Sequence, residues 1–207
     1  PEEKASILEG LKEPGPWLLT LCVAGLAFGA SVYTGLYPSY LSSPQGCGLD
    51  PATANNLVSI GSIGGIVGSV AIGWVINHFK PSKRGIISIV VFALCFSVPV
   101  GIMAAFIFFY AAVSQFSMPI AFAWIPDVLK DQKTLSMATG ILMIGANIGG
   151  ALGITLPSMA IDAAGGAWAA ALPVVVGLAI VGLVCALALH VFVQRKVVPV
   201  RSDLQDK

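Results

Sequence analysis

Charged side chains are scarce in this sequence of 207 residues. Asp, Glu, Lys and Arg make up 10% of it, against roughly 25% in soluble domains. Hydrophobic residues make up 57%, and the mean hydropathy is +0.89. Most of such a chain cannot face water, so we expect an integral membrane protein with the lipid bilayer as its surroundings. The net charge of +1 is too near balance to suggest a nucleic-acid partner.

Several patterns with a known chemical meaning are absent as well. Alternation of apolar and polar residues with a period of two is missing, which excludes an outer-membrane barrel and leaves helices as the spanning elements. The sequence contains no GxSxG, HExxH or GxxxxGK motif, so we do not expect an enzyme. The cysteines have no metal-binding or redox spacing, and we expect no metal, cofactor or disulfide framework: they are Cys22, Cys47, Cys95 and Cys185.

The apolar residues form segments long enough to cross a bilayer, which needs about 20 residues per helix. We predict a transmembrane domain over 17–193, between a cytoplasmic linker 1–16 and a cytoplasmic tail 194–207. A tight turn near Pro99 separates the third span from the fourth, because their common apolar run is about twice the length that one span needs. The six predicted spans cover residues 17–41, 55–79, 85–98, 101–128, 134–161 and 167–192.

The cationic side chains predict the orientation of the chain. With six spans, all 11 Lys and Arg residues fall on one side of the membrane, and the other side has none. Loops that carry Lys and Arg remain cytoplasmic, so both termini are predicted to be cytoplasmic. The residues are Lys4, Lys12, Lys80, Lys83, Arg84, Lys130, Lys133, Arg195, Lys196, Arg201 and Lys207.

Small residues recur at every fourth position in the second and the fifth predicted span. In lipid, helices associate through close backbone packing, and a row of small residues on one face permits that approach. Asn147 lies between the glycines of the fifth span, and we predict that its amide bridges to a neighbouring helix. The predicted interface residues are Gly61, Gly65, Ser69 and Gly73 in the second span, and Gly145, Asn147, Gly149 and Gly153 in the fifth.

The second half of the chain repeats the pattern of the first. Besides the two glycine rows, the first and the fourth span each carry a polar and aromatic patch before a late proline, Pro38 in SVYTGLYPSY and Pro119 in SQFSMPIAFAW. Three spans followed by three similar spans of opposite direction form an inverted repeat, as in secondary transporters that bind at the repeat interface. The predicted fold is therefore an all-α polytopic membrane protein with six transmembrane helices in a 3+3 inverted repeat.

Six spans with the loop GWVINHFKPSKR after the second resemble the C-terminal half of a major facilitator superfamily transporter. The family's loop motif is a glycine, an acidic residue four positions later, and a short basic run. Asn77 departs from the motif, because an amide cannot form the charged pair that an aspartate would form. The residues that match or replace the motif are Gly73, Asn77, Lys80, Lys83 and Arg84.

This resemblance implies secondary active transport of a small solute by alternating access. It also implies a partner, either an N-terminal six-helix half or a second copy of the chain, against which the second and fifth spans pack. The family lines its path with the first and fourth spans of each half. The implied substrate-path residues are polar or aromatic positions there, namely Tyr33, Thr34, Tyr37, Tyr110, Ser114 and Gln115.

Other interpretations stay open on the sequence alone. Tyr37, Tyr40 and Trp124 also suit the aromatic belt at the membrane interface, which we favour for Tyr40 and Trp124. Asp127 and Asp131 are expected on a solvated loop face. No span has an ionisable residue in its middle. If transport is coupled to protons or the substrate is charged, the titratable residue is therefore predicted to lie in the N-terminal half. The alternatives to a transporter half are a six-helix scaffold or assembly subunit and a self-pairing half-size carrier.

Overall fold

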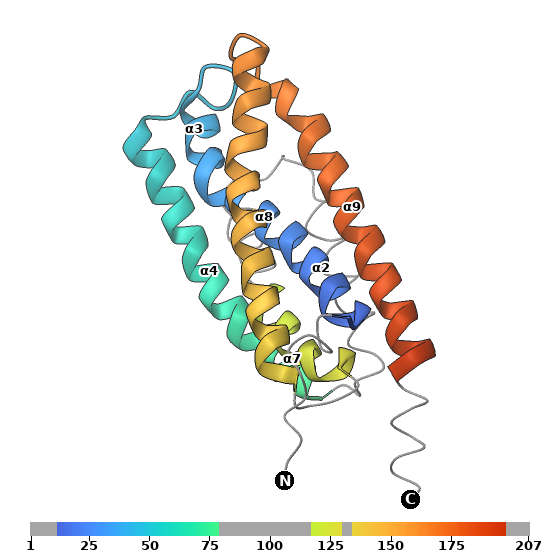
Figure 1. The fold of residues 1–207 in the computed structure, drawn as a ribbon. Coiled ribbons are helices and arrows are strands. Elements are labelled where there is room, and N and C mark those ends of the chain that lie inside the picture. The colour runs from blue at the N-terminus through green and yellow to red at the C-terminus, as the bar shows by residue number, and fades with distance from the viewer. Residues whose placement is uncertain (1–11, 79–116, 130–133, 198–207) are drawn as a thin grey trace, which may run out of the picture.

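The computed structural model describes residues 12–78, 117–129 and 134–197, and every regular element in these ranges is helical (Figure 1). The predicted all-α class is confirmed for this part of the chain. The elements are α2 (Pro14–Ser31), η1 (Val32–Leu36), α3 (Tyr37–Ser42), α4 (Pro51–Asn77), α7 (Ser117–Val128), α8 (Leu135–Ala163), η3 (Trp168–Ala170), α9 (Ala171–Phe192) and η4 (Val193–Val197).

Four helical segments are long and apolar enough to cross a membrane. They lie over the predicted first, second, fifth and sixth spans. The predicted third span and residues 101–116 of the fourth lie outside the described residues, so six helices and the 3+3 repeat stay predictions. The four segments are Pro14–Ser42, Pro51–Val75, Leu135–Ala163 and Trp168–Arg195.

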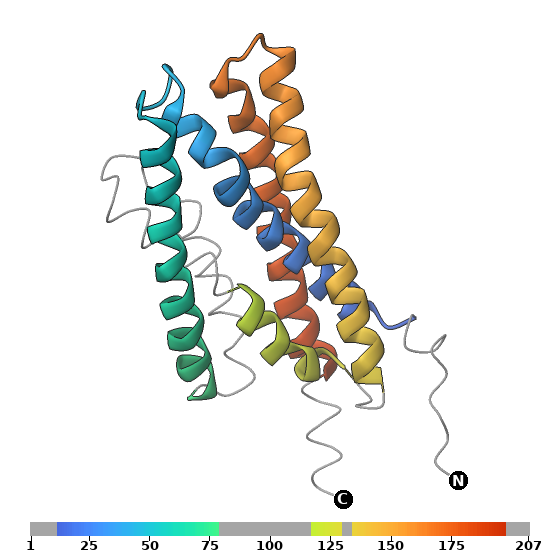
Figure 2. The ribbon, with the colours of Figure 1, turned by 90° about the vertical axis from the view of Figure 1, so that its left-hand side faces the viewer.

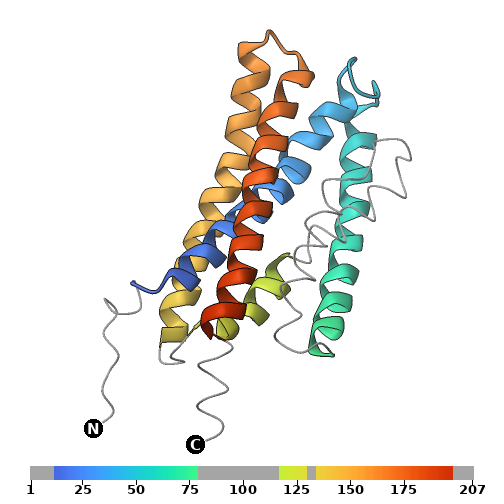
Figure 3. The same cartoon turned by 90° about the vertical axis from the view of Figure 1, so that its right-hand side faces the viewer.

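The long helices pack side by side, and α2 crosses obliquely among them (Figures 1 and 2). Figure 3 shows the side opposite to that of Figure 2, and there α9 passes in front of α2. Both α4 and α8 are rich in glycine, which lowers helix stability in water. In lipid the backbone must satisfy its own hydrogen bonds, so these apolar segments are helical nevertheless.

The start of α2 and the end of α9, the element ends next to the described cations, lie at one end of the bundle (Figure 1). The ends of α4 and α7 and the start of α8 lie at the same end (Figure 1). Lys12 precedes α2, and Arg195 and Lys196 follow α9, so these three residues belong to that end. This arrangement agrees with the predicted segregation of charge, while the side that faces the cytoplasm stays a prediction.

The core of the described bundle lies around α2, toward the end that carries these cations. Buried side chains from α7, α8 and α9 meet the buried face of α2 in one hydrophobic cluster. A smaller cluster lies near the opposite end, where α3 and η1 contact the beginning of α4. The first span therefore packs against different neighbours at its two ends.

The glycine row of α8 packs directly against the backbone of α2. A side-chain carbon added at Gly145, Gly149 or Gly153 would collide with α2, at Thr20, Ala24 and Phe28 respectively. This contact agrees with the predicted role of these glycines as a helix interface, and the close approach that glycine permits is used within the chain. Packing of the fifth span against a partner half stays a prediction. At Gly73 in α4, by contrast, an added carbon would meet none of the described residues.

The beginning of α4 is fixed by Asp50, which directly precedes Pro51. One carboxylate oxygen of Asp50 accepts hydrogen bonds from the Thr53 backbone N–H and from the Thr53 hydroxyl, both at 2.9 Å. A carboxylate at this position satisfies an N–H group that has no partner within the helix, and proline suits the first helical position. The exposed loop between the first two spans thus ends in a defined helix start.

Replacement of Gly149 by alanine tests the contact between α2 and α8. We expect a loss of about 1–3 kcal/mol in stability, because the new methyl group would meet the backbone of Ala24 rather than a flexible side chain. The measurement is the Tm of the purified protein in detergent. The matched control is Gly140→Ala in the same helix, where an added carbon meets none of the described residues. An equal Tm for the two variants contradicts the packing.

The cap on α4 predicts a dependence on pH. The hydrogen bonds from Thr53 hold the pKa of the Asp50 carboxyl below its ordinary value of 3.8. A carboxyl with a lowered pKa stabilises the folded state above its ordinary value, and this stabilisation is lost as the pH falls through the folded pKa. We expect the difference in Tm between wild type and Asp50→Asn to shrink below pH 4, and a difference that stays constant down to pH 3 contradicts this role.

Candidate functional site

The first span is broken at the position where its polar and aromatic residues lie. Residues Val32–Leu36 form a π-helical turn, in which the Tyr37 N–H donates to the carbonyl of Val32, five residues earlier. Pro38 follows directly, and proline has no N–H to continue an α-helical ladder and clashes with the preceding turn. The wider turn accommodates the proline, and such π-turns occur frequently at functional sites. The late proline of the first span is thus preceded by a π-turn that joins α2 to α3.

Two of the predicted path residues, Tyr33 and Tyr37, meet in this broken segment. Tyr33 lies in η1 and is only 5% exposed, and Tyr37 begins α3. Their rings stack with centroids 5.7 Å apart and an interplanar angle of 28°. The two rings therefore form one aromatic surface, which is buried at Tyr33 and partly exposed at Tyr37.

The aromatic contacts continue from Tyr37 toward the end of the bundle. The ring of Tyr37 stacks on Tyr40 at a centroid distance of 6.2 Å, and Tyr40 meets the edge of Trp168 at 5.5 Å. Four aromatic rings thus follow one another from η1 to η3. Tyr40 is half-buried in this row: its ring contacts Tyr37 and Trp168, and part of its side chain stays exposed.

The remaining predicted path residues are not brought to this surface by the described structure. Thr34 is exposed, and its hydroxyl donates to the carbonyl of Ala30 at 3.1 Å, within the same helix. Gly35 lies beside it, and an added carbon there would meet the side chain of Ile154 in α8. The other three predicted residues, Tyr110, Ser114 and Gln115, lie outside the described residues.

Two residues of α7 are buried where the sequence predicted otherwise. Trp124 is 2% exposed and belongs to the main core, so the prediction of an interface-belt residue is wrong. Asp127 is 5% exposed, which also contradicts a solvated loop face for it. Lys130, Asp131 and Lys133, which suggested that face, lie outside the described residues. The apolar residues that precede Asp127 in the sequence were the available signal for its burial.

The polar residues of the two glycine rows bond within their own helices. Asn147 is exposed, and its amide donates to the carbonyl of Met143 at 2.8 Å, which corrects the predicted bridge to another helix. The Ser69 hydroxyl donates to the carbonyl of Gly65 at 3.0 Å. Hydroxyl and amide side chains commonly bond one turn back when no other partner is near. Gly61 and Gly65 are buried.

The loop that carried the family resemblance is described only at its start. Gly73 and Asn77 belong to α4, and Asn77 is its last residue. The basic residues Lys80, Lys83 and Arg84 lie outside the described residues. Within the described ranges, no group of three or more His, Cys, Asp or Glu residues is placed to hold a metal ion. Cys22 and Cys185 are free cysteines, and Cys47 is exposed.

Comparison with known protein families decides the class of the molecule. The family model described as Major Facilitator Superfamily matches residues 19–207, most of the chain. The chain belongs to the major facilitator superfamily. No curated protein and no solved structure gave a match. Membership agrees with the apolar spanning helices and identifies this membrane protein with a superfamily of transporters.

In this superfamily member, Pro38 is predicted to keep Tyr33 and Tyr37 in contact. Pro38→Ala restores a backbone N–H, so we expect the π-turn to return to α-helical pitch and α3 to rotate by about 100°, the angle of one residue. Ser39 is exposed in α3, and this rotation would turn its position away from the exposed side. A cysteine placed there should therefore react several times more slowly with a water-soluble maleimide in the Pro38→Ala background.

The control for this experiment is a cysteine at Asn56, an exposed position in α4 that the rotation does not involve. Both cysteine variants carry Cys47→Ser, because Cys47 is itself an exposed cysteine that could react with the reagent. We expect the reaction at position 56 to be the same with and without Pro38. If the rate at position 39 also stays the same, the π-turn does not depend on the proline.

Proposed function

We propose that this chain is the C-terminal six-helix half of a secondary active transporter, which moves a small solute by alternating access. The observation that carries the proposal is the buried contact between Tyr33 and Tyr37 at the break in the first span, in a chain of the major facilitator superfamily. In transporters, broken helices near the middle of the membrane supply binding groups for the substrate. An irregular backbone at membrane depth is tolerated where protein buries it or where it lines a cavity.

The chemistry of this surface favours a solute with an apolar or aromatic part. Tyr33 and Tyr37 present ring faces, which attract apolar groups, other rings and cations. Each residue also carries a hydroxyl group that can donate or accept a hydrogen bond. No charged side chain takes part in this stack of described residues. A substrate charge or a coupling proton would therefore be met by groups elsewhere in the complete carrier.

The partner half is proposed to cover faces of α4 and α8 other than the glycine row of α8. That row is already occupied by α2. On α4, the large side chains Ile63, Val70 and Trp74 are exposed, and on α8 the same holds for Ile148. Exposed apolar surface of this extent suits lipid or another helix. Both termini are proposed to be cytoplasmic, because the described cations gather at one end of the bundle.

The alternative is a membrane scaffold without transport, or a half-size carrier that pairs with itself. A scaffold needs the helix contacts and has no use for the buried tyrosines at the break. A self-pairing carrier needs both the helix contacts and the tyrosines. Transport measurements therefore distinguish the proposed carrier from a scaffold, and the number of chains in the active complex distinguishes it from a self-pairing carrier.

Replacement of Tyr33 by leucine tests the proposed site. We expect uptake into vesicles that contain the intact protein to fall at least tenfold, since the variant removes one ring of the stack and its hydroxyl. Uptake is first established with panels of labelled sugars, organic anions and drugs. The matched control is Trp17→Leu, an aromatic replacement in the same span at a side chain that is 46% exposed, where we expect uptake to change less than twofold.

The amount of each variant in the membrane is measured in parallel, so that a loss of protein is not taken for a loss of transport. Normal uptake by Tyr33→Leu at equal protein level removes Tyr33 from the site. Absence of uptake for every panel, in protein that is correctly folded by its Tm, favours the scaffold.

A further inference from the structure

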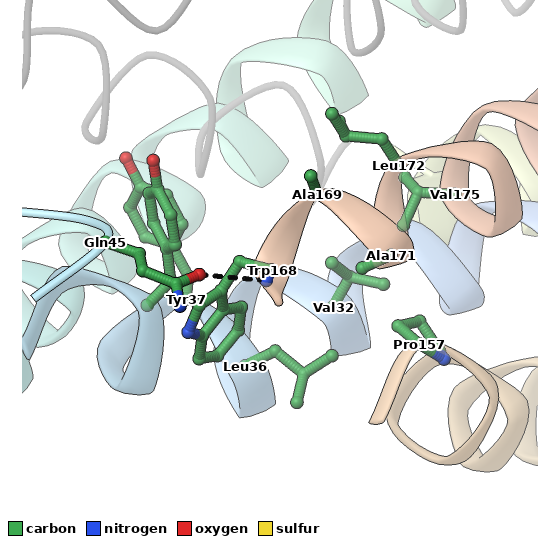
Figure 4. A pocket seen from close by; sticks show the side chains of 11 residues that line it. Val32, Leu36, Tyr37, Gln45, Pro157, Trp168, Ala169, Ala171, Leu172 and Val175 are labelled. Carbon is green, nitrogen blue, oxygen red and sulfur yellow. Dashed lines mark hydrogen bonds between the residues drawn. The ribbon is translucent and has the colours of Figure 1, made fainter. Parts of the chain in front are cut away.

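A cavity of about 490 Å³ lies near the end of the bundle opposite to the described cations (Figure 4). Its walls come from η1 and α3 of the first span, from Pro157 of α8, and from η3 and the beginning of α9. The volume falls within the range of about 300–1,000 Å³ that is usual for ligand-binding pockets. The stacked tyrosines Tyr33 and Tyr37 form a different feature, although the ring of Tyr37 also lines this cavity.

The polar groups of the cavity wall lie at the end near the loops. Gln45, Tyr40 and Trp168 belong to this end, because they lie in or beside the connections between helices. The deeper wall is aliphatic and includes Val32 and Val175. Val175 follows Trp168 by seven residues, which is about 10 Å along a helix. The cavity therefore changes from polar to apolar over most of the depth of one hydrocarbon leaflet, about 15 Å.

Exposed apolar side chains of α9 lie beside the cavity. Leu172 lines the cavity and is itself 62% exposed, and the next apolar side chains on α9, Val176 and Ile180, are more than half exposed. A large apolar surface on a spanning helix is in contact with lipid unless another protein covers it. A lipid chain in contact with this surface would reach the cavity without crossing the interior of the bundle.

Gln45 provides a polar anchor at the mouth of the cavity. Its side-chain oxygen accepts a hydrogen bond from the Trp168 backbone N–H at 3.2 Å, and Figure 4 shows this bond beside the aromatic rings. The bond fixes the side chain, and the amide nitrogen keeps two N–H groups that can donate to an ester or phosphate oxygen. The mouth thus suits a polar headgroup, and the deeper part suits a hydrocarbon chain.

We propose that this cavity binds one acyl chain of a membrane phospholipid, with the glycerol and phosphate region beside Gln45. The chain would fill apolar space between α3 and α9 that would otherwise lack packing partners. The acyl chain would also pack against the part of the Tyr37 ring that lines the cavity. Lipid binding is independent of the proposed transport, since it is measured without any substrate.

The test uses the intact protein in phosphatidylcholine vesicles that contain a phosphatidylcholine with a diazirine on one acyl chain. After irradiation, mass spectrometry identifies the labelled peptides. We expect labelling of residues 32–45 and 168–175 in the wild type, and at least fivefold less in Val175→Phe, which fills the cavity. Val176→Phe places the same ring on the exposed face one residue further on, and we expect its labelling to stay within twofold of the wild type.

A second variant and a second probe keep the result unambiguous. Ala171→Phe fills the cavity from another position in its wall and should reproduce the loss, with the Tm of each variant as the test of folding. A free diazirine fatty acid, added from solution, tests the other source of an acyl chain. Equal labelling in Val175→Phe and Val176→Phe overturns the site, and labelling of the cavity by the fatty acid but not by the phospholipid overturns the lipid assignment.

Discussion

The contact between α2 and the glycine row of α8 is the constraint on which the arrangement of the bundle depends. Lipid tails are as apolar as leucine, so burial of side chains adds little to the association of spanning helices, and close packing decides it. Glycine at positions 145, 149 and 153 lets the α2 backbone lie directly on α8. The main core then forms beside this contact, where α7 and α9 add their buried side chains to α2.

Because α2 is fixed against α8, the break at η1 decides the direction of the rest of the span. Beyond the break, α3 contacts the beginning of α4, where Leu41 packs with Ala54 and Val58. Tyr33 is buried in this second cluster. The first span therefore changes its packing partners at the residues that form the proposed substrate surface. A site between two packed units can change shape when one unit moves relative to the other, as alternating access requires.

The sequence predicted the features that depend on the spacing of residues and on the length of apolar segments. It did not identify which part of the protein each residue packs against. Apolar runs of spanning length predicted the helical class, and the family resemblance singled out Tyr33 and Tyr37, whose rings stack in the structure. A glycine row predicts a close contact without naming the helix that provides it, so Gly149 was identified as an interface residue but its partner α2 was not. The same limit applies to Trp124, because an indole near a span end suits a lipid interface and a protein core equally well.

The same break explains both the stacked tyrosines and the cavity behind them. An unbroken α-helix would follow the line of α2, whereas the π-turn before Pro38 lets α3 contact α4. Space then remains between α3 and the beginning of α9, bridged at the mouth by the bond between Gln45 and Trp168. Aliphatic side chains line the deeper part of this space, which water would fill at a cost and an acyl chain would fill without one. The irregularity that forms the proposed substrate surface thus also creates the proposed site at which a lipid of the membrane would contribute to packing.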